Sequence, residues 1–284
     1  MARLSPEQYA ALNIPQLLTQ GKSLVEVGHR IFETPRKFDL NDAPSLMAIA
    51  FSTKQLEHAG SVESLFQNDF HRDCEIIGRV SLEGYILLSW SFNSDSDTRK
   101  SRTNRWLGYE FVEEYRALKR RHMQSREPAN ADLKVDQCEW DHIRDLLLSK
   151  SEPMIRSKYK NTPPDKREIP FEDYWEYKWN NESIEIMIDD LGDKDAKNWY
   201  RTASQWIHWS PYPIFNAINL DEQEPIWFQP NAYDAAARGI AIVYYSLACC
   251  LLILDSHLEL GQDKIIRSES PFNLPSFSDR FPQS

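Results

Sequence analysis

Glycine and cysteine are scarce in this 284-residue chain, which contains nine glycines and four cysteines. Average composition would place about twenty glycines in a chain of this length. Because tight turns depend on glycine, the shortage argues against an all-β fold with many hairpins. The cysteines form no Cys-x-x-Cys pair and two of them are adjacent, which excludes a zinc ribbon and a disulfide framework. We therefore expect reduced thiols.

Positive charge is also in short supply. The chain has 33 Lys and Arg against 43 Asp and Glu, a formal net charge of −10 at pH 7. Proteins that coat nucleic acid are normally basic, so the count disfavours that class. It remains compatible with an enzyme that has a local basic groove.

Signals for secretion or for a membrane span are missing as well. The first residues lack the apolar core of a signal peptide. The longest apolar run, residues 239–254, is shorter than the roughly 20 residues that a spanning helix needs. We expect a helix that is buried by its neighbours, in a cytoplasmic protein.

Motifs for cofactors and metals are absent from the sequence. It contains no glycine-rich phosphate or dinucleotide loop, no His-Glu-x-x-His and no Gly-x-Ser-x-Gly. The seven histidines are scattered, without His, Cys and acidic residues at metal-ligand spacing. We expect no cofactor and no metal.

Apolar residues at helical intervals are what the chain does contain. The longest such pattern, from Glu63 to Phe92, predicts one continuous helix. Further helices are expected at about 6–32, 45–60, 98–124, 132–159, 182–191, 193–209 and 231–260. Residues 214–218 and 225–228 predict at most one small β-hairpin. The predicted fold class is all-α, an antiparallel helical bundle.

Composition divides the chain into three parts. A polar, proline-rich stretch at about 160–171 is the clearest break and indicates a surface loop. We expect residues 1–60 to form an N-terminal helical extension and residues 61–264 to form the bundle, with this loop inside it. Residues 265–284 are expected to form an extended tail.

Arg201 and His208 lie seven residues apart within the predicted helix 193–209. Seven residues turn a helix by about 700°, so both side chains leave from one face, roughly 10 Å apart. Arginine binds phosphate through its fork of donors, and histidine exchanges a proton near neutral pH. Such a pair can cleave RNA without a metal. The structural alternative is that Arg201 pairs with an acid from residues 189–195, and that His208 stabilises a helix end.

Arg79 and Glu83 stand four residues apart on the predicted helix 63–92. At this spacing two opposite charges form an ion pair within a helix, which is the simpler interpretation. The functional interpretation is that Glu83 orients Arg201 or His208.

The predicted helix 98–124 is rich in Lys and Arg. Its residues Arg99, Arg102, Arg105 and Tyr109 are candidates for RNA contacts, because a basic patch can follow a phosphate backbone. Trp209 is a candidate for stacking on a base. The alternatives are a solvated helix face with internal Glu–Arg pairs, and a tryptophan that packs in the core or in an interface.

Two segments of the chain resemble a family of uncharacterised bacterial and archaeal proteins over about residues 65–260. The first is Arg79-Val-Ser-Leu-Glu83-Gly-Tyr, followed by Arg105-Trp-Leu-Gly-Tyr109 and a charged helix. The second has a short acidic helix, then Tyr200-Arg201, and ends in His208-Trp-Ser-Pro211.

The spacing of Arg201 and His208 is in turn similar to the signature of the HEPN superfamily. That signature is an arginine, usually followed by a polar residue, then four to six residues and a histidine. Arg201, Thr202 and His208 match it. The resemblance implies a dimeric helical bundle that cleaves RNA without a metal, as a toxin or antiviral-defence effector, with a partner protein from the same system. Because some HEPN proteins are inactive, it also implies an alternative, a non-catalytic scaffold or interaction protein.

Overall fold

The computed structural model describes residues 13–34, 39, 42–124, 137–146, 180, 182–207, 233–272 and 274. Within these residues every regular element is an α-helix and no strand occurs, which confirms the predicted all-α class. The helices are α2 (Ile14–Glu33), α3 (Ala43–Gln67), α4 (His71–Phe92), α5 (Ser96–Gln124), α6 (Gln137–Leu146), α8 (Ile184–Leu191), α9 (Lys194–Ile207), α11 (Tyr233–Leu258) and α12 (Asp263–Glu269). The residues expected to form a hairpin, 214–218 and 225–228, lie outside the described ranges.

The chain forms two compact units. One unit runs from residue 1 to 95 and from 184 to 284, and the other from Ser96 to Ser183. The first unit therefore contains α2 and α3 together with α4, α8, α9, α11 and α12. This grouping differs from the expected division at residue 60, because α3 crosses that position and packs on both α4 and α11.

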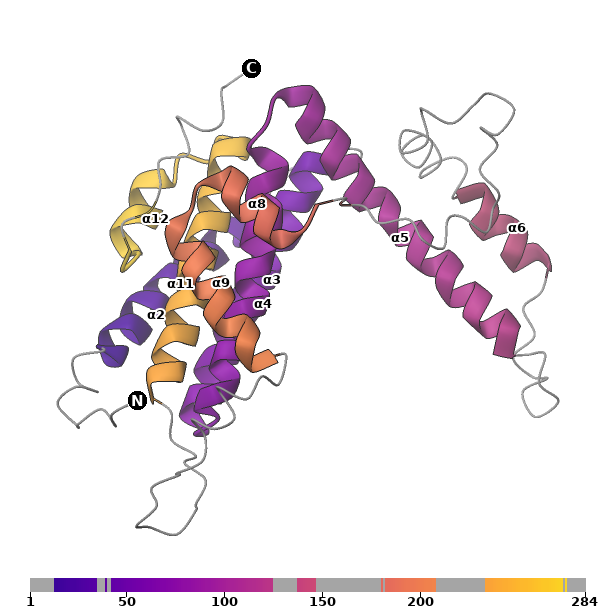
Figure 1. The fold of residues 1–284 in the computed structure, drawn as a ribbon. Helices are drawn as coiled ribbons and strands as arrows, with labels where there is room; N and C mark the ends of the chain where they lie inside the picture. The colour runs from indigo at the N-terminus through magenta and orange to yellow at the C-terminus, as the bar shows by residue number, and fades with distance from the viewer. Residues whose placement is uncertain are drawn as a thin grey trace, which may run out of the picture. The chain divides into compact units, whose positions relative to one another are not determined.

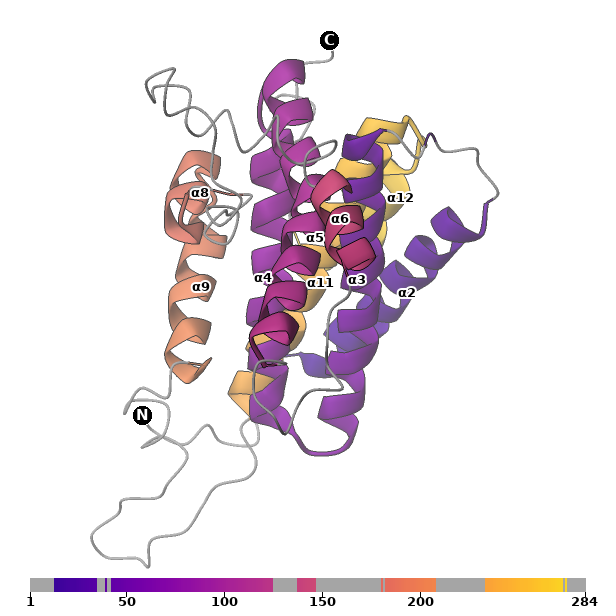
Figure 2. The same cartoon turned by 90° about the vertical axis from the view of Figure 1, so that its right-hand side faces the viewer.

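Helices α3, α4 and α11 run side by side at the centre of the first unit, with α8 and α9 along α4 (Figures 1 and 2). Hydrogen bonds from Gln55 to the Ser81 carbonyl and from Ser52 to the Cys250 carbonyl join α3 to its two neighbours. Helix α3 runs antiparallel to both, so α4 and α11 are parallel to each other. Helix α2 packs on α11 and α12.

Helices α4 and α11 approach closely where two glycines meet. A Cβ atom on Gly239 would lie 2.3 Å from the carbonyl carbon and oxygen of Cys74, and one on Gly78 would lie 3.0 Å from the Gly239 Cα. No side chain fits such a gap, so the backbones themselves are in contact. Most of α11 is buried, including the run from Ile242 to Asp255.

Helix α11 is long and apolar enough to cross a membrane, judged by length and composition among the described residues. However, 89% of its most apolar window is buried inside the fold. The helix is therefore compatible with the core helix of a soluble protein, as its sequence predicted.

The predicted continuous helix from Glu63 to Phe92 is wrong, because the chain leaves the helical path at Asn68 and Asp69. Asp69 has a φ of 62°, and the Phe70 amide donates to the Leu65 carbonyl. This pattern is a Schellman motif, in which a left-handed residue lets the last amides close the helix. Asparagine and aspartate tolerate the left-handed region better than other non-glycine residues, so the Asn-Asp pair was the available signal.

The helix expected at 45–60 runs seven residues further, to Gln67, while the described ends of the helices expected at 98–124, 182–191 and 231–260 agree to within two residues. Gly192, with a φ of 63°, separates α8 from α9 as predicted. Of the helix expected at 132–159, the described part is α6. Helix α12 was not predicted, and it occupies residues 263–269, where the bundle was expected to end and the tail to begin. Its seven residues are too few for a clear apolar period.

Candidate functional site

Helix α9 carries the described half of the predicted catalytic pair. Arg201 and Thr202 are exposed residues on this helix, and the Thr202 hydroxyl donates a 3.1 Å hydrogen bond to the Asn198 carbonyl of its own helix. The helix ends at Ile207. The other predicted residues of this segment, His208 and Trp209, lie outside the described residues.

The start of α9 is held by Asp193. One of its carboxylate oxygens accepts a 3.0 Å hydrogen bond from the Ala196 amide, so Asp193 caps the helix. The other oxygen accepts hydrogen bonds from two tyrosine hydroxyls, Tyr85 of α4 at 3.0 Å and Tyr245 of α11 at 2.8 Å. Burial is the main cause that raises the pKa of both tyrosines above their usual value. Both therefore stay protonated donors at neutral pH, as the contact requires.

The middle of α9 is held by Arg79, which lies buried on α4. Its Nε donates to the Ser204 hydroxyl at 3.0 Å, and an NH2 group donates to the Tyr200 hydroxyl at 3.0 Å. The guanidinium also lies 4.7 Å from the centre of the Tyr200 ring. Its third partner is Glu83, one turn along α4, at 2.6 Å. All arms of the guanidinium fork are thus in use.

These contacts connect the two predicted groups of residues in a way that the sequence did not specify. Glu83 forms the expected ion pair with Arg79, and its connection to the turn that bears Arg201 runs through Arg79, Tyr200 and Ser204. Tyr200 and Ser204 had not been predicted from the sequence as residues of the candidate site. Their spacing of four residues, next to Arg201, was the signal that could have identified them.

Arg201 itself differs from its neighbours in having no ion-pair or hydrogen-bond partner among the described residues. The structural alternative was a pair with an acid of residues 189–195. Two of these acids are engaged elsewhere: Asp189 pairs with Lys197, and Asp193 accepts from the two tyrosines. The guanidinium is therefore available to an anion from solution.

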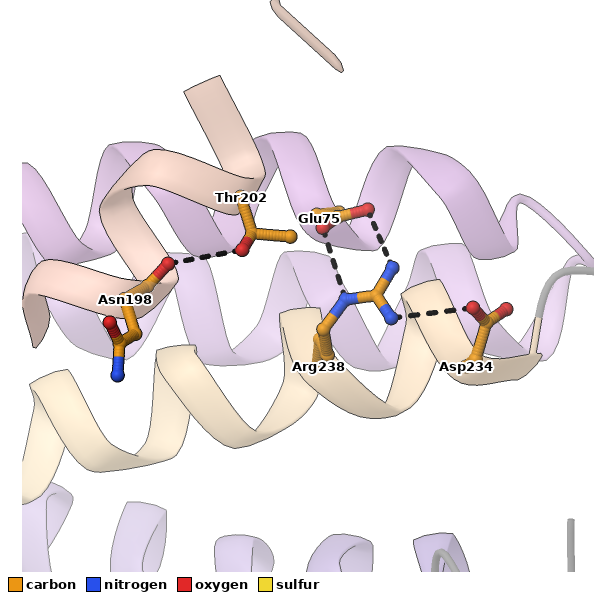
Figure 3. A network of polar contacts seen from close by, with 5 residues as sticks. All are labelled: Glu75, Asn198, Thr202, Asp234 and Arg238. Carbon is orange, nitrogen blue, oxygen red and sulfur yellow. Dashed lines mark hydrogen bonds and ion pairs between the residues drawn. The ribbon is translucent and has the colours of Figure 1, made fainter. Parts of the chain in front are cut away.

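A second polar cluster joins α4 and α11 (Figure 3). Arg238 of α11 bridges Glu75 of α4 at 3.2 Å and Asp234 of its own helix at 3.3 Å. Glu75 is almost fully buried, and this desolvation raises the pKa of its carboxyl, while Arg238 acts in the opposite direction. In Figure 3 the Thr202 side chain points toward this cluster. No sequence motif pointed to Glu75 or Arg238.

The candidates for RNA contacts on α5 belong to the second compact unit. Tyr109 accepts a hydrogen bond from Arg116, which also pairs with Glu113. Arg99 and Arg102 have partners within the chain as well. Arg105 is half-buried. The Arg116–Glu113 pair is of the kind that the alternative of internal Glu–Arg pairs expected.

The described residues contain no group of three or more His, Cys, Asp or Glu side chains that could hold a metal ion. What the first unit offers instead is an exposed arginine, Arg201, on a helix that hydrogen bonds anchor to α4 and α11. Such an arrangement binds an anionic group, such as a phosphate, without a metal.

Comparison with protein families gives one match, to a family of unknown function, DUF5677, over residues 46–225. This range contains 180 of the 284 residues, from α3 to beyond α9. The chain belongs to this family. No curated protein and no solved structure matches it. Arg79, Glu83 and Arg201, and the residues that connect them, all lie in the matched range.

Proposed function

We propose that this protein is a metal-independent endoribonuclease of HEPN type, in which Arg201 and His208 act on RNA. The resemblance of the segment Arg201-Thr202 to His208 to the HEPN signature suggests this reaction. The exposed position of Arg201 is the structural observation that carries the proposal, since the guanidinium has no carboxylate partner among the described residues. The all-α bundle is compatible with it.

In the proposed reaction, Arg201 holds the scissile phosphate and offsets the negative charge that grows in the transition state. The 2′-hydroxyl of the ribose attacks the adjacent phosphorus while the bond to the leaving 5′-oxygen breaks. His208 takes the proton from the 2′-hydroxyl or delivers one to the 5′-oxygen. The product carries a 2′,3′-cyclic phosphate, and DNA resists because it lacks the attacking hydroxyl.

The proposal includes a homodimer, in which two such histidines can divide the roles of base and acid. It also includes a cytoplasmic toxin or antiviral-defence effector, with Arg99, Arg102, Arg105, Tyr109 and Trp209 as RNA contacts. Thr202, the polar residue of the signature, supports the site.

The experiment that tests the proposal combines expression in a bacterium with cleavage of RNA by the purified protein in the presence of a chelator. We expect the parent to slow growth and to produce fragments that end in a 2′,3′-cyclic phosphate. His208→Ala is expected to lower the cleavage rate about 10²- to 10⁴-fold, the contribution of a general acid or base. Arg201→Ala is expected to lower it about 10²- to 10³-fold.

A half-buried lysine and an exposed histidine provide matched controls. Lys197→Ala removes a cation from the same helix, and His29→Ala removes a histidine from α2. Both are expected to cleave RNA as fast as the parent. If His208→Ala remains as toxic as the parent, the assignment fails. If purified parent leaves RNA intact and expression is harmless, the alternative of a non-catalytic scaffold or interaction protein is favoured.

A further inference from the structure

Three residues that hydrogen-bond α9 to the rest of its unit lie on one face of the helix. Asp193, Tyr200 and Ser204 are separated by seven and four residues, which corresponds to about 700° and 1100° from the first to the others. Tyr200 and Ser204 therefore point about 20° to either side of Asp193, and the three directions span about 40°. We call these three residues the anchor face of α9.

The anchor face is held at both ends by residues of α4. Toward the start of α9, Asp193 accepts from Tyr85 at 3.0 Å. Two to three turns later, Tyr200 and Ser204 accept from Arg79, each at 3.0 Å. The later residues of α9 contact the earlier residue of α4, so the two helices are antiparallel. Because they touch at two separate points, their register is fixed.

Two points of contact on one face also fix the rotation of α9 about its own axis. Arg201 follows Tyr200 directly and leaves the helix about 100° away from it. With side chains a helix has a radius of roughly 5–6 Å, so a rotation of 20° would displace a group at its surface by about 2 Å. A misplacement of about 1 Å can cost a reaction about 100-fold in rate.

We propose that Arg79 is a positioning residue for the ribonuclease reaction, and that it acts by holding the Tyr200 and Ser204 hydroxyls so that Arg201 meets the phosphate in the productive direction. This inference rests on the proposed function. The guanidinium fork suits the role, because its donors reach Ser204, Tyr200 and Glu83 in fixed directions. A lysine offers a single nitrogen and cannot reproduce that geometry.

The experiment removes the two hydroxyls and keeps both arginines. We compare the double variant Tyr200→Phe/Ser204→Ala with the parent in single-turnover and steady-state cleavage of RNA, in binding of the same strand with 2′-deoxy nucleotides, and in thermal unfolding. The expected result is a fall of at least ten-fold in kcat, with KM and affinity for the deoxy strand within two-fold of the parent. Arg79→Lys is expected to show the same separation of kcat from KM. The control is Lys197→Ala, which breaks a contact of α9 with α8 instead of α4.

A double variant that cleaves as fast as the parent would overturn the positioning role and leave the ribonuclease itself intact. A parent that leaves RNA uncut would end the proposed function, and this inference with it. If the double variant unfolds at a much lower temperature, Tyr200→Phe alone decides, because it keeps the ring and the Ser204 contact. A lower kcat at an unchanged unfolding temperature then supports the role of Arg79, and an unchanged kcat excludes it.

Discussion

Helix α4 meets α11 on one side and α9 on another, and the two contacts are made by different groups. Against α11 the backbones touch at Gly78 and Gly239, and most of the surrounding side chains are apolar and buried. Against α9 the Arg79 guanidinium and the Tyr85 hydroxyl donate hydrogen bonds, on a helix that also buries Ala196 and Ala203. Close packing leaves no room for additional atoms, so the first contact specifies the core.

The second contact leaves one side of α9 available to solvent. Directional hydrogen bonds at a few points set the orientation of the helix while the remaining surface stays exposed. Arg201 lies on that surface. The comparison indicates that a few directional hydrogen bonds can orient a helix whose remaining surface stays exposed.

The largest effect is expected at the contact between α4 and α11. Gly239→Val would place a Cβ 2.3 Å from the Cys74 backbone, which forces the two helices apart. We expect a loss of about 3 kcal/mol or more in the free energy of unfolding, at the upper end for overpacked cores. Urea denaturation followed by circular dichroism measures it.

Gly60→Ala is the matched control, since no atom lies within 4 Å of a Cβ at that position of α3. It is expected to stabilise the protein by up to about 1 kcal/mol, because alanine has the higher helix propensity. A Gly239 variant as stable as the parent would contradict the close approach of the two helices.

A smaller loss is expected when the anchor at the start of α9 is removed. Asp193→Ala takes away a helix cap, worth about 1 kcal/mol, and leaves the hydroxyls of Tyr85 and Tyr245 without their acceptor. An unsatisfied buried donor costs about 1–3 kcal/mol, so we expect a total of about 2–4 kcal/mol. Asp190→Ala, an exposed neighbour, should stay within about 0.5 kcal/mol. Equal stability of the two variants in urea would show that the anchor is weak.

The contact between α4 and α11 should also weaken in acid because of His71. This residue is buried at the start of α4, with its ring 4.5 Å from that of Tyr233, and desolvation lowers its pKa below 6.5. A histidine with a lowered folded-state pKa contributes stability above pH 6.5, and that contribution is lost as the pH falls toward the folded-state value. We expect the parent to lose more stability than His71→Phe between pH 7.5 and pH 5.5, measured by urea denaturation.

His29→Gln tests whether this acid sensitivity belongs to the buried ring, since His29 is exposed on α2. Its pH dependence should match that of the parent. Glu75 acts in the opposite sense, because its raised pKa adds stability as the pH falls through the folded-state value toward 4.5. Glu75 is present in both the parent and His71→Phe, so its contribution cancels when the pH dependence of their stabilities is compared.

The smallest effect is expected at the ion pair that joins α9 to α8. Lys197→Ala breaks the surface ion pair with Asp189, and such pairs contribute about 0.2–1 kcal/mol. We expect a change of under about 0.5 kcal/mol in the free energy of unfolding, further reduced in high salt. A loss as large as that of Asp193→Ala would show that the ion pair with α8 stabilises α9 as much as the anchor at the start of the helix.

Helix class and most helix positions followed from local patterns. The Gly192 break and the buried run of α11 were both visible in the spacing of apolar residues and glycine. The prediction failed between Glu63 and Phe92, because the apolar period continued across the Schellman motif at Asp69. The periodicity of apolar residues indicates which side chains are buried, but it does not indicate where the backbone reverses direction.

The sequence by itself determined that this protein is a bundle of helices, that α11 is its most buried one, and that Arg201 and Thr202 lie on a helix. Only the tertiary structure decided that Arg79 reaches across to Tyr200 and Ser204, and that Asp193 collects two tyrosine hydroxyls from different helices. The reason is that helix periodicity is a local property, set by neighbours within four residues along the chain. The register between two helices depends on how their side chains interlock across more than a hundred residues of sequence.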